Sequence, residues 1–505
     1  MSHLLAVDVG TSSVKAGLVS TDGKLTRTAS REYTLATPRP HWCEIDPQVY
    51  WDCICSAVRE VVADGDPAET LALSVSSQGE TVIAVGNDSK PLGNAIVWLD
   101  DRAQQEAEEI AERFGRDLFY QRTGLECGPG WTGPKLLWLR RHEPELFTQT
   151  ARFLNVMDYV LLRMTGEAVT EPSLCQSTGY KELSAQTWWR EMLDYIGLQA
   201  GQLPRIATAG ETVGHLLPEA AAELGLSDRT WVVVGAMDQL AGAVGAGNVA
   251  PGSVTETTGS ALAIVATVDN IVLDPARRVP CVAHALRGRY VLLPYAPTAG
   301  MMLKWFRDQV LQANVSYGAL TAQAAAVPPG CDGLVAVPHL AGSLCPDNNP
   351  SARAAFVGLS LNHTQAHLVR AILESIAFLL ADNINLIRDL GVAVTSVRSM
   401  GGGANSDLWL QMKADVLDLA VERVAEPEAA LLGDGAFAGV AVGVWSNIEA
   451  AVAQVARTSC SFAPDRKRFD AYRQAHERCR ETYARLYGNH STSDRAMTWA
   501  SGRDR

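Results

Sequence analysis

The hydrophobic pattern of the chain contains two similar β-type segments, each interrupted by a small polar turn. Residues 4–15 (LLAVDVGTSSVK) place Gly, Thr and Ser between apolar stretches, and residues 254–266 (VTETTGSALAIVA) repeat this pattern. Each segment predicts a β-hairpin whose turn presents backbone N–H groups and hydroxyls to one point. Such a turn suits an anion such as phosphate, and two of them facing each other would hold a polyphosphate.

Helical and strand patterns alternate along most of the remaining chain. Asp46 and Pro47 provide an N-cap and a first-turn proline for a helix with one apolar face. Residues 71–77 and 82–85 predict two strands, and residues 364–390 predict a long helix. Alternation of this kind favours an α/β protein with mixed sheets over a sandwich or a helical bundle.

A buried strand is predicted shortly before the second hairpin. Residues 231–235 (WVVVG) lead into Asp238 and then into a helix of small residues over 239–246. The structural interpretation of a lone Asp at such a junction is a helix N-cap. Asp238 also directly precedes the connection between the two halves, so we expect it to line a cleft. A kinase that phosphorylates an alcohol needs a carboxylate there to accept the hydroxyl proton.

The length of 505 residues exceeds what one hydrophobic core usually covers, so at least two domains are expected. Residues 247–252 (GNVAPG) have the turn residues of a connector. We therefore expect an N-terminal lobe over residues 1–247 and a C-terminal lobe over 248–488. Residues 489–505, rich in Ser, Thr, Arg and Asp, predict a flexible tail.

Composition and charge indicate which classes of partner, and which cellular compartment, to expect. The net charge of −13 argues against a nucleic acid or an anionic membrane as partner, because both require basic patches. Neither a signal peptide nor an uncharged span of membrane length is visible. The ten cysteines are scattered without the spacing of a zinc site. We therefore expect a cytoplasmic protein with reduced cysteines.

A third glycine-rich segment lies between a β-type run and a helical pattern. Residues 400–405 (MGGGAN) follow the run 394–397 and precede the helical pattern 408–419. Glycines at a strand-to-helix junction let the backbone approach a ligand closely, and helix N-terminal amides can bind a nucleotide. Each of the three turns alone is also consistent with a structural turn. Together they predict a nucleotide site, with Asp8 ahead of the first turn as a Mg²⁺ ligand, direct or through water.

A polar loop is predicted between the strands 71–77 and 82–85. Residues 76–81 (SSQGET) gather side chains that could reach sugar hydroxyls. A polar hairpin loop without a ligand is the alternative interpretation.

Two longer segments resemble the signatures of a known family. Residues 130–139 (GWTGPKLLWL) with 141–145 (RHEPE) are similar to the first signature of the FGGY carbohydrate kinases. Residues 356–359 (FVGL) with 367–374 (HLVRAILE) are similar to the second. The resemblance extends from about residue 3 to about residue 487, and xylulokinases are the subfamily that the chain resembles most.

This resemblance implies two actin/hexokinase-like (ribonuclease H-like) lobes with an ATP cleft between them. It implies phosphorylation of a sugar or polyol hydroxyl by ATP with Mg²⁺, and a homodimer is common in the family. Asp238 matches the catalytic base and a substrate contact, while Asp8 would serve Mg²⁺ and Gln78, Glu80 and Trp98 would bind substrate. The implied nucleotide-binding residues are Thr11, Ser12, Ser13, Thr258, Gly259, Gly300, Gly402, Gly403 and Asp407.

Substrate identity follows less directly from the resemblance. Gly79-Glu80 stands where xylulokinases usually have Met-His and glycerol kinases have Arg-Glu, whereas Gly130 follows the xylulokinase pattern. Residues 342–347 (GSLCPD) also depart from the Gly-Glu-Arg-Thr-Pro of typical xylulokinases. We expect a ketopentose such as D-xylulose, with another pentulose, a polyol (glycerol, erythritol or xylitol) or a sugar acid as alternatives.

Two further alternatives belong to another functional class. One is a sugar-independent ATPase, because actin and heat-shock chaperones use the same paired hairpins; the sugar-kinase signatures argue against it. The other is a regulatory pseudokinase, against which the retention of Asp8, Thr11 and Asp238 argues.

Overall fold

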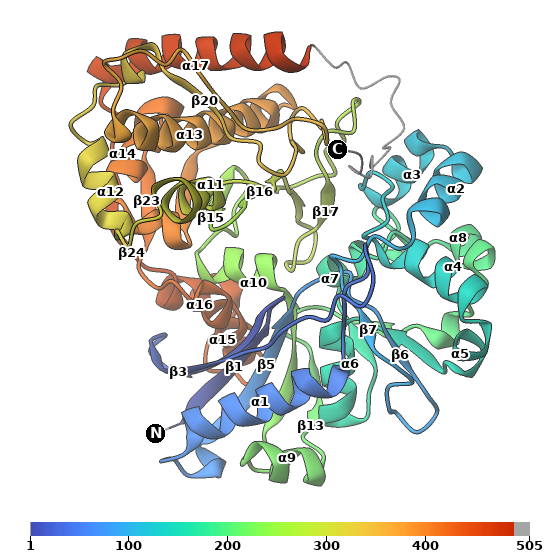
Figure 1. The fold of residues 1–505 in the computed structure, drawn as a ribbon. Coiled ribbons are helices and arrows are strands. Elements are labelled where there is room, and N and C mark those ends of the chain that lie inside the picture. The colour runs from blue at the N-terminus through green and yellow to red at the C-terminus, as the bar shows by residue number, and fades with distance from the viewer. Residues whose placement is uncertain (1, 489–505) are drawn as a thin grey trace.

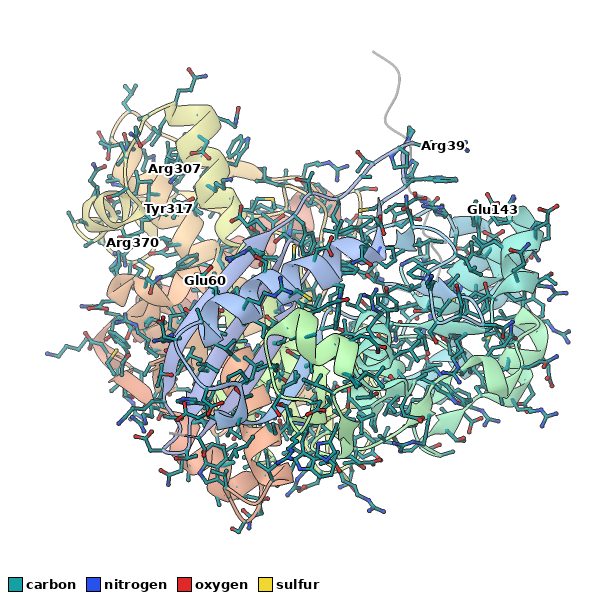
Figure 2. All side chains as sticks on the ribbon, turned by 90° about the horizontal axis from the view of Figure 1, so that it is seen from below. Arg39, Glu60, Glu143, Arg307, Tyr317 and Arg370 are labelled. Atoms are coloured by element: carbon teal, nitrogen blue, oxygen red, sulfur yellow. The ribbon has the colours of Figure 1, made fainter. Side chains whose placement is uncertain are left out.

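The computed structural model describes residues 2–488, and the tail expected at 489–505 lies outside the described residues. Two large mixed sheets, each covered by helices, form two lobes (Figure 1). The α/β architecture with two actin/hexokinase-like lobes is therefore confirmed. Figure 2 views the molecule from below, with Glu60 and Glu143 in the N-terminal lobe and Arg307, Tyr317 and Arg370 in the C-terminal lobe.

The first sheet has six strands in the order β13-β14-β5-β1-β2-β3. The predicted first hairpin is confirmed: β1 pairs antiparallel with β2, so that Asp8 lies opposite Lys15, and β1 pairs parallel with β5. The strands are β1 (His3–Val9), β2 (Ser13–Ser20), β3 (Leu25–Glu32), β5 (Thr70–Ser77), β13 (Thr212–His215) and β14 (Trp231–Met237).

The second sheet repeats this arrangement. The hairpin β15-β16 is confirmed, and β15 pairs parallel with β22 just as β1 pairs with β5. The order is β17-β18-β16-β15-β22-β23-β24, with β19 also paired to β16. The strands are β15 (Ser253–Thr258), β16 (Leu262–Val268), β17 (Cys281–Ala283), β18 (Tyr290–Leu292), β19 (Tyr295–Ala296), β22 (Ser396–Met400), β23 (Val421–Val424) and β24 (Thr458–Phe462).

The N-terminal lobe carries most of its helices in the chain between β5 and β14. Helix α1 begins as predicted, because the Asp46 side chain accepts a hydrogen bond from the backbone N–H of Gln48. The helices are α1 (Pro47–Val62), α2 (Gln104–Phe114), α3 (Arg116–Thr123), α4 (Thr132–His142), α5 (Pro144–Gln149), α6 (Val156–Thr165), α7 (Pro172–Gln176), α8 (Arg190–Ile196) and α9 (Pro218–Leu224). Short strands accompany them: β4 (Glu44–Ile45), β6 (Ile83–Val85), β7 (Ala95–Ile96), β8 (Arg152–Leu154), β9 (Val169–Thr170), β10 (Lys181–Glu182), β11 (Thr187–Trp188) and β12 (Arg205–Ile206).

The C-terminal lobe is covered by the long helices α13 and α17, which lie at the top of Figure 1. The predicted helix at 364–390 is confirmed as α13. The remaining elements are α10 (Asp238–Gly245), α11 (Gly300–Trp305), α12 (Tyr317–Ala324), β20 (Val335–Val337), β21 (Ala355–Val357), α13 (Gln365–Asp389), α14 (Asp407–Leu417), α15 (Ala429–Ala441), α16 (Ile448–Val455) and α17 (Arg466–Tyr487). Among residues 2–488, no helix combines the length and apolar character that a membrane span requires.

Two hydrophobic cores lie on the two sheets, and the first draws on chain from far beyond its own lobe. Leu431 and Phe437 of α15 and Val452 of α16 are buried in the core of the first sheet. Helices α15 and α16, although they lie far along the chain, therefore complete the core of the first lobe. The lobe boundary near residue 248 stays a prediction.

Helices α10 and α15 cross in direct backbone contact at the junction between the lobes (Figure 1). A Cβ atom on Gly433 would lie 2.0 Å from the carbonyl oxygen of Ala241, and one on Gly245 would lie 1.9 Å from that of Ala429. Only glycine permits this approach. It fixes the start of α10, and therefore Asp238, beside the first sheet.

Candidate active site

The first phosphate turn is tightly closed and held from the side. The backbone N–H of Gly10 donates to the carbonyl of Ser13 at 3.0 Å, and the hydroxyl of Tyr33 donates to the carbonyl of Gly10. The indole Nε1 of Trp98 donates to Oγ1 of Thr11 at 2.9 Å. Two residues predicted for different ligands, Thr11 for the nucleotide and Trp98 for the sugar, are thus in direct contact.

Gln78 joins the polar loop to this turn. Its side-chain amide nitrogen lies 3.2 Å from the carbonyl of Gly10 and 3.1 Å from the hydroxyl of Tyr50. Its side-chain oxygen accepts from the hydroxyl of Thr81. Only 2% of the residue is exposed. The structure therefore gives Gln78 a positioning contact, and its predicted contact with the sugar stays a prediction.

Glu80 lies at a strained point of the polar loop and is partly exposed. Its φ of 58° is left-handed, and the preceding Gly79 packs so tightly that an added Cβ would lie 3.0 Å from the Ser177 hydroxyl. Burial raises the pKa of the Glu80 carboxyl to about 7, although Lys135 opposes the shift.

Lys135 is a site residue to which the sequence reasoning gave no role. Its side chain is fully buried, and its ammonium group donates to the carbonyl of Val97 at 2.9 Å and lies 3.4 Å from that of Glu80. Burial lowers the pKa of Lys135 to about 8, while the negative charge of Glu80 acts in the opposite direction. The lysine belongs to the segment 130–139 quoted for the family resemblance, so a signal was present.

Asp238 is the first residue of α10. The N-cap interpretation is wrong, because the N-cap is Met237 and the Asp238 carboxylate accepts only from the adjacent Gln239 N–H, at 2.6 Å. Burial raises the pKa of Asp238 to about 8, and the negative charges of Asp8 and Glu80 add to this shift. The structure therefore brings Asp8 and Glu80 close enough to Asp238 to raise its pKa.

Asp8 lies at the end of β1, facing a second carboxyl group that the sequence did not indicate. Its Oδ1 lies 3.3 Å from the hydroxyl of Ser76, and burial raises its pKa to about 6 against the opposing charge of Lys15. The same Ser76 hydroxyl lies 2.6 Å from Oδ2 of Asp434, a fully buried residue of α15. Asp434 sits in a helix of small residues far along the chain, where no local motif marks it.

The donor set at Asp8 fits Mg²⁺. The ion prefers carboxylate oxygen, and in phosphate-transferring sites it is commonly held by one or two carboxylates together with water and substrate phosphates. Asp8 supplies such an oxygen, and a nearby cation would lower its raised pKa. Within residues 2–488 no group of three potential ligands forms a cage by itself.

Three segments meet around the second phosphate turn. The backbone N–H of Gly300 donates to the carbonyl of Gly259 at 2.9 Å, and a Cβ on Gly300 would lie 2.5 Å from that oxygen. A Cβ on Gly403 would lie 2.7 Å from the side chain of Thr258, whereas one on Gly402 would meet nothing within 4 Å. The structure thus gathers Gly259, Gly300, Gly402 and Gly403 at one place.

The side chain of Thr258 points into the protein. Its hydroxyl donates to Glu256 at 2.7 Å and accepts from Lys413 at 2.8 Å, within a fully buried ion pair whose Lys413–Glu256 distance is 2.6 Å. Any contact of Thr258 with a nucleotide would therefore involve its backbone. Neither Lys413 nor Glu256 was indicated by the sequence, because their pairing joins distant segments.

Asp407 lies at the edge of this group. Its side chain is 76% exposed and pairs with Arg423, while the neighbouring Ser406 caps α14. Ser12 is likewise exposed at the tip of the first turn. The roles of the two turns and the glycine group toward a nucleotide, and of the three carboxyl groups toward Mg²⁺ and a hydroxyl, stay predictions.

The sequence of this chain is similar to those of known carbohydrate kinases. Sequence profiles of the FGGY family of carbohydrate kinases match residues 3–245 (N-terminal domain) and 260–442 (C-terminal domain). The chain is 31% identical to a xylulose kinase of Bacillus subtilis, over 94% of this chain and 95% of that protein. It is 29% identical to a gluconokinase of the same organism, over 86% of each.

The fold comparison agrees with the sequence comparison. The crystal structure of a ligand-bound xylulose kinase from Lactobacillus acidophilus superimposes with a TM-score of 0.90 at 26% identity, covering 96% of this chain and 98% of that chain. Profiles, relatives and fold together show that this chain belongs to the FGGY family of carbohydrate kinases, which transfer phosphate from ATP to a sugar.

Proposed function

We propose that this kinase phosphorylates a hydroxyl group of a ketopentose such as D-xylulose, with Mg²⁺ as its metal. The observation that carries the proposal is the 31% identity to a xylulose kinase over nearly the whole chain, combined with the position of Asp238 near Asp8 and Glu80. Gly130 supports it as well, because a glycine at this position follows the xylulokinase pattern and its backbone lies beside the Trp98 carbonyl.

The charge of the site favours a neutral sugar over a sugar acid. Glu80, Asp8 and Asp238 place three carboxyl groups at the substrate loop, the end of β1 and the start of α10, and each adds negative charge when it ionises. The ammonium group of Lys135 is buried and already donates to backbone carbonyls. A carboxylate substrate would face these acidic groups without the lysine as counter-charge, which costs binding free energy.

In the mechanism that we infer, the sugar binds beside Glu80 and Trp98 with its reacting hydroxyl at Asp238. The Asp238 carboxylate orients this hydroxyl and accepts its proton as the γ-phosphoryl group arrives. The backbone N–H groups of turns 10–13 and 258–261 stabilise the phosphate charge. Mg²⁺ held by Asp8 would neutralise the charge that develops on the phosphates. Lobe closure excludes water, which would otherwise accept the phosphoryl group.

Gluconate is the second candidate, favoured by the 29% identity to a gluconokinase. Coupled ADP release with D-xylulose, D-ribulose, L-ribulose, glycerol, xylitol and gluconate distinguishes the candidates. We expect the largest kcat/KM with a ketopentose, and a loss of at least tenfold in Glu80→Gln through a raised KM. Preference for gluconate would overturn the assignment of substrate and leave the kinase assignment intact. A cytoplasmic location and a homodimer stay predictions.

A further inference from the structure

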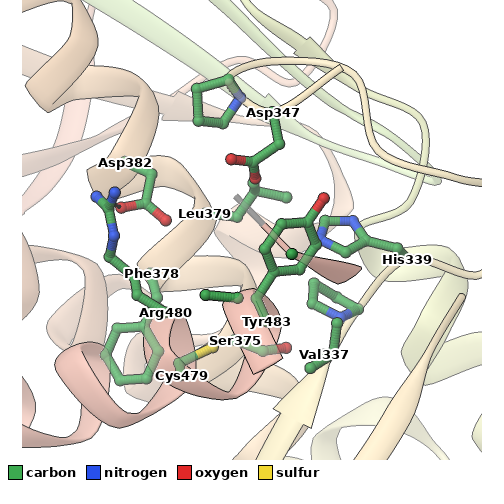
Figure 3. Close-up of a pocket in the computed structure, with 14 residues that line it drawn as sticks. Val337, His339, Asp347, Ser375, Phe378, Leu379, Asp382, Cys479, Arg480 and Tyr483 are labelled. Carbon is green, nitrogen blue, oxygen red and sulfur yellow. Dashed lines mark hydrogen bonds and ion pairs between the residues drawn. The ribbon is translucent and has the colours of Figure 1, made fainter. Parts of the chain in front are cut away.

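A cavity of about 340 Å³ lies in the C-terminal lobe, between α13, α17, the chain after β20 and the loop at Pro346 (Figure 3). None of the residues assigned above to ATP, Mg²⁺ or the sugar lines it. Its volume falls within the range of about 300–1,000 Å³ that is typical of small-molecule sites.

Two polar side chains that line this cavity, His339 and Tyr483, make no side-chain hydrogen bond with good geometry among residues 2–488. His339 lines it and is only 5% exposed, yet within residues 2–488 its ring makes no hydrogen bond. The buried hydroxyl of Tyr483 has no partner with good hydrogen-bond geometry among the described residues, although Ser343 and Asn349 lie close enough to influence its pKa. Native proteins leave few such groups unpaired, and each one indicates a missing water or ligand.

Asp347 adds an acceptor to the same space. Within the described chain its carboxyl group forms no ion pair or hydrogen bond, and Figure 3 shows it above Tyr483 and Leu379. Burial, and then the charge of Asp382, raise its pKa to about 6. The charges of Arg480 and Arg278 oppose this shift. A partly buried carboxyl group that receives no hydrogen bond is nevertheless costly.

Donors and apolar surfaces complete the lining. Arg480 donates to Oδ1 of Asp382 at 3.0 Å, and His476 binds the same oxygen, so Oδ2 of Asp382 has no partner in the described part of the chain. The Tyr483 ring meets the His339 ring edge-on at 5.3 Å, and Phe378 and Leu379 provide apolar walls.

This combination selects one ligand class. An anion would meet Asp347 and Asp382, whereas an ammonium ion offers only donors and gives the Tyr483 hydroxyl no acceptor. A hydroxyl group both donates and accepts, and the carbon skeleton of a polyol can pack on the apolar walls. We propose that this cavity binds a small neutral polyhydroxy compound, at a second site separate from the catalytic cleft.

Binding of xylitol, followed by saturation-transfer NMR on the full chain, tests the proposal. All variants carry Glu80→Gln, so any weak xylitol signal from the sugar loop is common to all of them, and a difference between a variant and this parent reports on the cavity. We expect Asp347→Ala, and separately Tyr483→Phe, to weaken xylitol binding by about tenfold or more, because hydrogen-bonding groups lose their partners.

Glu481→Gln is the matched control, because this exposed acid on α17 does not line the cavity. It should bind xylitol as the Glu80→Gln parent does. The absence of xylitol binding in the parent, or equal binding in Asp347→Ala, Tyr483→Phe and the control, would overturn the proposal and leave a cavity that holds only water. Neither result depends on turnover, so failure of the proposed kinase substrate would be distinguishable.

Discussion

The hydroxyl group of Ser76 lies 2.6 Å from Oδ2 of Asp434, a carboxyl group that is completely buried on α15. The same hydroxyl oxygen lies 3.3 Å from Oδ1 of Asp8. A serine hydroxyl has one hydrogen and cannot donate to both carboxyl groups at once. Burial raises the pKa of Asp434 well above its ordinary value, and the Ser76 hydroxyl links this carboxyl group to that of Asp8. Helix α15 thereby positions the residue assigned to Mg²⁺.

Asp434→Ala should weaken binding of Mg·ADP and lower the free energy of unfolding by about 1–3 kcal/mol, because Ser76 loses a buried partner. Asp434→Asn keeps the size and a donor, and should retain most of both properties. Calorimetric titration with Mg·ADP and denaturant unfolding measure the two effects. Ser74→Ala, which removes the longer 3.3 Å contact to Asp434, is the control and should change little. Equal Mg·ADP affinity in Asp434→Ala and wild type would refute the positioning role.

The rate should depend on pH through Asp238. A base must be ionised, so turnover rises with pH as Asp238 loses its proton, with an inflection at or below about 8 because bound Mg²⁺ favours the carboxylate. Glu80 is one of the negative charges that raise this pKa. The inflection of the pH–rate profile should therefore move to lower pH in Glu80→Gln. An inflection that stays in place or rises contradicts the assignment.

Stability should change with pH in the opposite sense. Folded Asp238 holds a proton that the unfolded chain loses near pH 4, so the free energy of unfolding falls as pH rises from about 4 to about 8. Asp238→Asn carries no such proton and keeps the contact to the Gln239 N–H. Its Tm relative to wild type should rise across this interval, even though turnover is lost. A pH-independent Tm difference would show that Asp238 is not buried against the other carboxyl groups.

Neighbouring glycines provide a matched pair for the nucleotide site. Gly402 has open space beside it, so Gly402→Ala should keep the free energy of unfolding within about 0.5 kcal/mol of wild type while weakening ADP binding. Gly403 contacts Thr258, so Gly403→Ala should cost about 1–3 kcal/mol through overpacking. Thermal unfolding and calorimetric titration with ADP separate the two. Unchanged ADP affinity in Gly402→Ala would remove that residue from the nucleotide site.

The sequence predicted the features that are encoded locally. Both hairpins depend on alternating apolar residues and turn glycines, and helix α1 on the Asp46 cap, so short windows contain the information. The glycine segment 400–405 was predicted for the same reason, and it does lie against the second hairpin turn.

Features that depend on distant pairing were not predicted. Lys413 and Glu256 form a buried pair across 157 positions, and Asp434 meets Ser76 across 358. The sequence of α15 is that of an ordinary helix of small residues. Its close glycine contacts with α10, and the burial of its apolar residues in the first core, appear only in the structure. The N-cap interpretation of Asp238 failed because the helix begins one residue earlier than a cap at that position requires.

The central claim is that Asp238 activates a sugar hydroxyl for attack on ATP. The most direct measurement is coupled ADP release by the purified protein with Mg·ATP and D-xylulose, compared between wild type and Asp238→Ala. We predict sugar-dependent ADP release that falls by orders of magnitude in the variant, with Mg·ADP binding near wild type. Sugar-dependent release at the wild-type rate in Asp238→Ala, or release that no sugar affects, would contradict the account.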